Sequence, residues 1–182
     1  MPASVPGRTA PRWGWHRLAD SWAFRVVDAA GVRPGELVLD IGAGDGALTA
    51  PLLAAGAHVI AVELHAGRRT ALRTRFAGSR VTVVGADALE LRLPRRPFRV
   101  VANPPYSTWA AVLRRLMARG SRLRAADLVL PRAVVNRYAL GQAPGAERWT
   151  RDYVVRRGLM VPRTAFVPPP PRDSAVLVIR RR

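Results

Sequence analysis

The segment DIGAGDG, residues 40–46, constrains the fold more than any other part of the chain. It follows a short apolar run, residues 36–41, and precedes residues 47–55, which have helical periodicity. A short apolar run before a glycine-rich turn indicates a buried strand. Glycines at such a strand-to-helix turn let the backbone approach a ligand closely at the helix N-terminus. Because an ordinary tight turn also favours glycine, the loop alone does not identify the ligand.

The same alternation of apolar runs and helical segments continues along the chain. We expect further strands at residues 58–64, 81–84, 98–102, 126–130, 153–161 and 175–180, and helices at 13–30, 47–55, 66–76 and 107–118 and after Pro131. Alternating strands and helices predict an α/β fold, with a mostly parallel sheet covered on both faces. The last two strands are joined by a loop around the proline run 168–171. This loop is too short for a crossover helix, so they should form an antiparallel hairpin at the sheet edge.

Composition narrows the function. The 182 residues carry 30 arginines, no lysine and 12 acidic residues, a net charge of +18. Codon bias explains arginine replacing lysine but not the excess of basic residues, which favours a polyanionic partner such as nucleic acid. Cysteine is absent and the three histidines lack metal-ligand spacing, so we expect no metal site. No apolar run approaches the roughly 20 residues of a membrane span, and the N-terminus lacks a signal-peptide pattern, which predicts a cytoplasmic protein.

Two acidic residues stand at the ends of the next two expected strands, as the glycine loop does at the end of the first. Glu63 ends the second expected strand, about 20 residues after the loop, where a carboxylate can accept hydrogen bonds from ribose hydroxyls. Asp87, followed by Ala88, comes after the third, where it can accept a hydrogen bond from an adenine amine. With Gly42 and Gly44 they form a nucleoside site without a phosphate-binding lysine. This pattern favours S-adenosylmethionine over NAD or ATP.

The fourth strand runs into Asn103-Pro104-Pro105-Tyr106. Two prolines could simply stiffen a turn. In the functional interpretation, the Asn103 side chain and the Pro104 carbonyl accept both hydrogens of an exocyclic base amine. The nitrogen lone pair then points at the methyl group, and Tyr106 stacks on the base. Positioning rather than a strong base would carry the catalysis.

Together these motifs resemble those of the ribosomal RNA adenine N6-methyltransferases. Residues 166–175 (FVPPPPRDSA) are similar to a further signature of that family, F-x-P-x-P-x-V-D-S-A, and the resemblance runs from about residue 13 to residue 182. It implies a Rossmann-like class I methyltransferase domain with a seven-stranded sheet. It also implies that Phe166 stacks on the target adenine opposite Tyr106, and that His16 and Leu18 line the methionine end of the cofactor. Without the resemblance, Phe166 would be interpreted as a core residue.

The segment WGWHRL, residues 13–18, resembles the short actinobacterial macrolide–lincosamide–streptogramin resistance methyltransferases. This likeness implies an adenine in the peptidyl-transferase region of 23S ribosomal RNA as target, and antibiotic resistance as the result. The family more often has Leu or Ile where Pro104 stands. We expect a flexible basic arm at residues 1–12, one methyltransferase domain at 13–182 without the family's C-terminal helical RNA-binding domain, and a monomer.

Two alternatives remain open at this point. A DNA adenine or cytosine amino-methyltransferase is favoured by the NPPY motif, but no target-recognition domain is recognisable. A catalytically silent RNA-binding factor could use the same fold, although an intact cofactor loop and an intact NPPY motif count against it.

Overall fold

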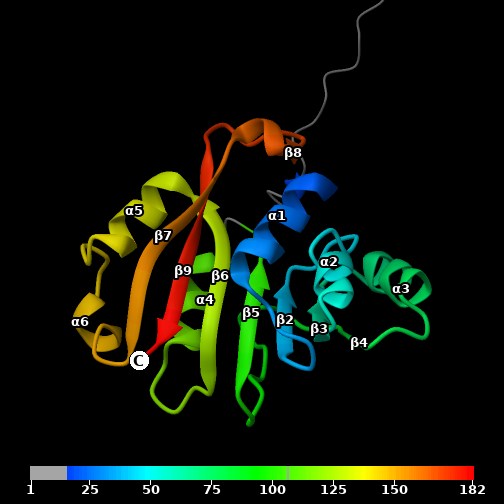
Figure 1. Ribbon diagram of the computed structural model, residues 1–182, viewed down its shortest axis with the longest axis horizontal. Coiled ribbons are helices and arrows are strands. Elements are labelled where there is room, and N and C mark those ends of the chain that lie inside the picture. The colour runs from blue at the N-terminus through cyan, green and yellow to red at the C-terminus, as the bar shows by residue number, and fades with distance from the viewer. Residues whose placement is uncertain (1–15, 106) are drawn as a thin grey trace, which may run out of the picture.

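The computed structural model describes residues 16–105 and 107–182. Its centre is a seven-stranded sheet in the order β4-β3-β2-β5-β6-β9-β7 (Figure 1). The strands are β2 (Leu37–Ile41), β3 (His58–Val62), β4 (Val81–Val84), β5 (Phe98–Ala102), β6 (Leu123–Pro131), β7 (Tyr153–Val161) and β9 (Ser174–Arg181). All are parallel except β9, which pairs antiparallel with both β6 and β7. The expected sheet is confirmed, as is the antiparallel pairing of the last two long strands. Of these two, β7 forms the edge of the sheet and β9 lies between β6 and β7.

Helices cover both faces of the sheet. They are α1 (Asp20–Ala30), α2 (Thr49–Ala54), α3 (Ala66–Arg75), α4 (Trp109–Leu116), α5 (Arg132–Ala139) and α6 (Ala146–Trp149). Side chains of α1, α2 and α3 join one apolar core with strand residues such as Val38, and those of α4, α5 and α6 join a second core with residues such as Leu39. Since successive side chains of a strand point to opposite faces, the continuous apolar runs of the sequence supply both cores at once.

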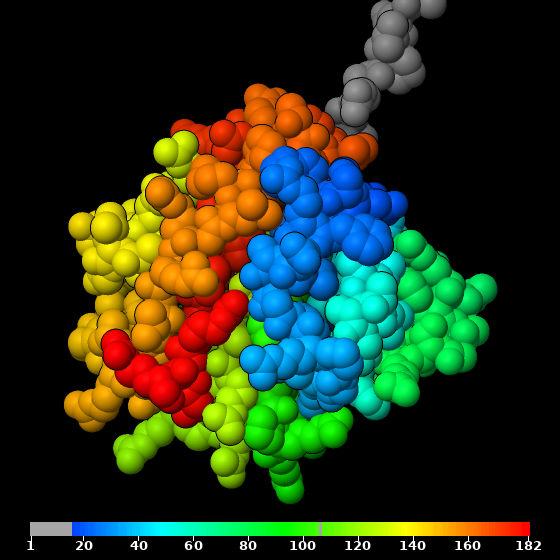
Figure 2. Space-filling view, viewed as in Figure 1, coloured from blue at the N-terminus to red at the C-terminus, as the bar shows by residue number. Residues whose placement is uncertain are grey.

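The N-terminal helix begins later than the sequence predicts. Residues Arg17–Leu18 form a short strand, β1, which pairs antiparallel with β8 (Phe166–Val167), following the one-turn helix η1 (Arg163–Ala165). The backbone N–H of Ala19 donates to the carbonyl of Ala165, 2.8 Å away. This pairing with residues far along the chain holds residues 17 and 18 extended, against their helical spacing. Figure 2 shows the blue N-terminal segment lying against the orange segment that contains β8.

No helix in the described part of the chain is long and apolar enough to cross a membrane.

Candidate active site

The loops after β2 and β3 are bound to each other at the carboxyl ends of the strands. The N–H groups of Gly42 and Ala43 donate to the carbonyl of Val62, at 2.8 and 3.0 Å. The N–H of Gly44 donates to Oε2 of Glu63 at 2.8 Å, and Oε1 of the same carboxylate accepts from the N–H of His65 at 2.8 Å. Glu63 is 6% exposed. Backbone donors from two loops therefore fix the carboxylate that the sequence predicts as the ribose acceptor.

The glycine loop also lies against the segment that follows β5. Gly42 has a φ of 78°, in the left-handed region, and a Cβ at this position would lie 3.0 Å from Cδ of Pro105. Glycine is needed here both for its backbone conformation and for the close approach of two loops. The structure thus brings the predicted cofactor loop and the predicted catalytic segment into contact.

Asn103 is held by the N-terminal segment. Its Nδ2 donates to the backbone carbonyl of His16 at 2.9 Å, while Nδ1 of the His16 ring lies 2.8 Å from the carbonyl of Pro168. Pro104, the next residue, is buried. His16 therefore links Asn103 to the segment around Pro168, which is distant in sequence from both.

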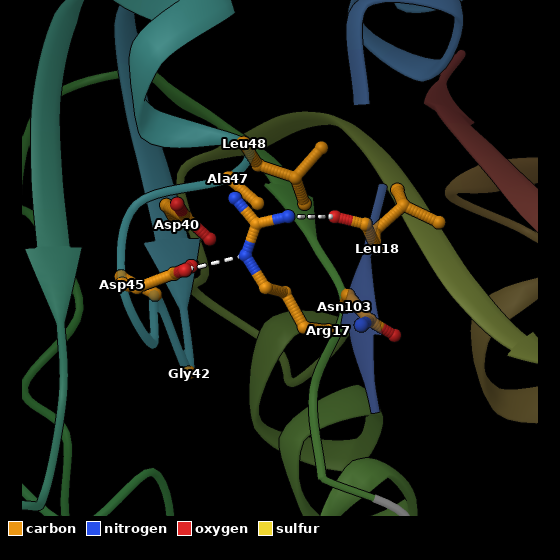
Figure 3. A pocket seen from close by; sticks show the side chains of 9 residues that line it. Arg17, Leu18, Asp40, Gly42, Asp45, Ala47, Leu48 and Asn103 are labelled. Carbon is orange, nitrogen blue, oxygen red and sulfur yellow. Dashed lines mark hydrogen bonds and ion pairs between the residues drawn. The ribbon is translucent and has the colours of Figure 1, made fainter. Parts of the chain in front are cut away.

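A cleft opens between Asn103 and the glycine loop (Figure 3). It is lined by Arg17, Leu18, Asp40, Gly42, Ala43, Asp45, Ala47, Leu48 and Asn103. Asp40 is 1% exposed and its Oδ2 accepts from the hydroxyl of Thr49 at 2.7 Å. Burial raises the pKa of Asp40 from 3.8 to about 7, and the nearby Glu63 adds to this effect, whereas the Thr49 hydrogen bond opposes it.

Arg17, which also lines the cleft, bonds two other carboxylates. Its Nε donates to Oδ2 of Asp45 and its Nη2 to Oδ1 of Asp20, the latter at 2.6 Å. The hydrogen bond to Asp45 is the largest of the effects that raise the pKa of Arg17 above its usual value. Both Arg17 and Asp45 were missed by sequence reasoning. Arg17 stands between His16 and Leu18, so its position in that motif was the available signal.

The two residues predicted at the adenine end lie in the loop after β4. Asp87 and Ala88 are both half-buried, and Oδ1 of Asp87 accepts from the N–H of Leu89 at 2.8 Å. Leu64, directly after Glu63, is 61% exposed. Sequence reasoning treated Leu64 only as the end of a strand.

Phe166, which the resemblance implies stacks on the target adenine, is a buried residue in this structure. Phe166 is 2% exposed and belongs to the apolar core that also contains Leu18 and Val176. Phe166 pairs with Leu18 in the β1–β8 ladder. The structure supports the other interpretation, a packing residue. Tyr106, its expected partner, lies outside the described residues.

Among residues 16–105 and 107–182, no group of three or more histidine and acidic side chains is arranged to hold a metal ion.

A family model for ribosomal RNA adenine dimethylases matches residues 18–182. The chain belongs to this family. It is 33% identical over 187 residues to a ribosomal RNA small subunit methyltransferase A of Alcanivorax borkumensis, covering 93% of this chain and 65% of the relative. An rRNA adenine N-6-methyltransferase of Corynebacterium diphtheriae is 33% identical over 167 residues, covering 91% and 64%. This member of the family thus spans somewhat less than two thirds of the length of these two relatives.

Solved structures support the same assignment. The 23S rRNA methyltransferase ErmE superimposes with a TM-score of 0.84 at 26% identity, over 91% of this chain and 70% of ErmE. A dimethyladenosine transferase from Plasmodium falciparum superimposes with a TM-score of 0.79 at 23% identity, over 92% and 64% of the two chains, which supports the fold alone. The protein therefore has the class I fold of S-adenosylmethionine-dependent methyltransferases, as its motifs predicted.

Proposed function

We propose that this chain transfers a methyl group from S-adenosylmethionine to N6 of an adenine in 23S ribosomal RNA, in the peptidyl-transferase region. Resistance to macrolide, lincosamide and streptogramin antibiotics would follow. The observation that carries the chemical part is the fixed carboxamide of Asn103 beside the glycine loop. The RNA part rests on family membership and on the excess of 30 basic over 12 acidic residues.

The amine of adenine is a weak nucleophile because its lone pair is delocalised into the ring. Since Nδ2 of Asn103 donates to the carbonyl of His16, the carboxamide cannot rotate freely and Oδ1 is the atom that accepts from the amine. The carbonyl of Pro104, in a buried and rigid backbone, accepts the second amine hydrogen. Both bonds draw the nitrogen towards tetrahedral geometry. Catalysis then consists of holding the nitrogen in line with the methyl group.

Residues of the neighbouring loops fit the cofactor. When bound, S-adenosylmethionine supplies an electrophilic methyl group on a sulfonium. The Glu63 carboxylate is oriented by the N–H groups of Gly44 and His65, and its remaining lone pairs accept from the ribose hydroxyls. Asp87 and Ala88 hold the adenine ring, and Gly42 allows close approach of the backbone. His16 and Leu18 close the methionine end, Leu18 as part of the cleft wall.

Two ribosomal RNAs compete as the substrate. The similarity to ErmE, together with the WGWHRL segment, supports the large-subunit RNA. The relative from Alcanivorax borkumensis, and one from Leifsonia xyli at 38% identity over 172 residues, are named as small-subunit methyltransferases, which favours 16S RNA as the second candidate.

The test incubates the protein with radiolabelled S-adenosylmethionine and, separately, 23S RNA, 16S RNA and duplex DNA. We expect label in 23S RNA that Asn103→Ala abolishes. Asn136→Ala is the matched control, because Asn136 lies on α5 and accepts from Arg157 at the surface. Label only in 16S RNA would show that the substrate is 16S RNA rather than 23S RNA, with the same methyl-transfer reaction. Label only in DNA would support an amino-methyltransferase of DNA, and cofactor binding without any transfer would support a silent RNA-binding factor.

A further inference from the structure

Arg17 is the only cation among the described residues that line the cleft beside Asn103. Its backbone is fixed by the β1–β8 pairing, in register with Val167, and its side chain is 25% exposed. Figure 3 shows the guanidinium extending across the cleft towards the loop that carries Asp45. Nη1 also donates to the carbonyl of Leu18, 3.2 Å away. The strand position and this bond aim a positive charge into the cleft.

The position of the cleft indicates which part of a bound cofactor would occupy it. The sulfonium of S-adenosylmethionine carries three branches: the methyl group, the adenosine and the amino-acid tail. Under the proposed function, on which this inference rests, the methyl group faces Asn103 and the ribose lies at Glu63. The cleft is lined by Asn103 and Gly42 but by neither Glu63 nor Asp87. The remaining branch, the amino-acid tail, is the one that extends into it.

The charges of the cleft complement that tail. An amino acid is a zwitterion, and the cleft is lined by one guanidinium, that of Arg17, which bonds the carboxylate of Asp45, and by the buried acidic side chain of Asp40. A guanidinium donates two parallel N–H bonds to a carboxylate, a geometry that lysine cannot reproduce. The side chain of Asp45 is 41% exposed, so water can solvate it when Arg17 turns to another partner.

We propose that Arg17 binds the carboxylate of the methionine end of S-adenosylmethionine, exchanging its bond with Asp45 for one with the cofactor. Asp20 stays bound to Nη2 and keeps the guanidinium in place during the exchange. Arg17 is then a specificity-determining residue, which selects S-adenosylmethionine over analogues without the carboxylate.

The test measures dissociation constants by titration calorimetry for S-adenosylmethionine and for its decarboxylated form, which lacks only that carboxylate. The proteins are the full wild-type chain, Arg17→Gln and Arg17→Lys. Arg25→Gln is the control, with the same loss of charge on a residue whose guanidinium lies over Trp22, 4.1 Å from the ring centroid. We expect Arg17→Gln to weaken S-adenosylmethionine on the order of 10-fold or more, with Arg17→Lys intermediate. The decarboxylated form should bind Arg17→Gln and wild type within about 2-fold, because it never made the charge-assisted bond.

Other outcomes separate this inference from the proposed function. If Arg17→Gln weakens both ligands equally, its role is structural and the inference fails. If it tightens S-adenosylmethionine, Arg17 obstructs the cleft instead of binding the tail, and the inference also fails. If the wild type binds neither ligand, the proposed function itself is wrong. Binding of the decarboxylated form by Arg17→Gln demonstrates that this variant is folded.

Discussion

Asp40 gives the stability of the protein a pH dependence that can be isolated with one substitution. Burial raises the pKa of Asp40 from 3.8 to about 7. Between these values the folded protein holds a proton on Asp40 that the unfolded chain has released. Because the folded state binds more protons, the free energy of unfolding falls as pH rises from about 4 to about 7, and levels off above that.

The size of the effect follows from the two pKa values. Their separation, about 3, corresponds to roughly 4 kcal/mol at 1.36 kcal/mol for each pKa unit. Most of it develops between pH 5 and pH 8, where the wild type should lose about 2.5 kcal/mol from this residue alone. Asp40→Asn removes the titration and keeps an oxygen that accepts from the hydroxyl of Thr49. We therefore expect the variant to gain about 2.5 kcal/mol relative to the wild type over that range.

Urea unfolding followed by circular dichroism at pH 5, 6, 7 and 8 measures this difference, provided that the slope with denaturant is the same for both proteins. Other titrating groups are common to both proteins and cancel in the comparison. Asp152→Asn, which removes a carboxylate from an exposed turn, controls for the loss of one negative charge. A stability difference between Asp40→Asn and wild type that stays constant within about 0.5 kcal/mol from pH 5 to pH 8 would refute the reasoning.

Three further substitutions test the site and its supports. Glu63→Gln should weaken binding of S-adenosylmethionine on the order of 10-fold, measured by calorimetry. The N–H of Gly44 or that of His65 would then face the amide nitrogen of the new side chain instead of an oxygen. Glu147→Gln, at an exposed residue, is the control and should leave binding unchanged. Gly42→Ala should lose about 1–2 kcal/mol in urea unfolding, from its positive φ, with more if Pro105 does not shift. Phe166→Ala should lose about 3–5 kcal/mol, as a buried core residue does; a loss below about 1 kcal/mol would argue for an exposed ring.

Sequence reasoning recovered the parts of the fold that are encoded locally. Strands such as β4 and β5 were predicted with their observed bounds, because a buried parallel strand is a continuous apolar run between turn residues. Their carboxyl ends meet at one edge of the sheet. Gly42, Glu63 and Asn103 therefore lie where the order of the strands alone places them.

The errors arose where pairing between distant segments overrides a local pattern. Residues 13–30 have helical spacing, yet β1 is extended because β8, some 150 residues later, pairs with it and buries Leu18 and Phe166 together. That single pairing has two consequences for the site. It buries the Phe166 ring, and it brings the carbonyl of His16 to Asn103 and the guanidinium of Arg17 into the cleft. Phe166 is thus buried, and Arg17, for which the sequence predicts no role, lines the cleft beside Asn103. Neither placement could be predicted from the sequence, because side-chain direction in β1 and β8 depends on their pairing.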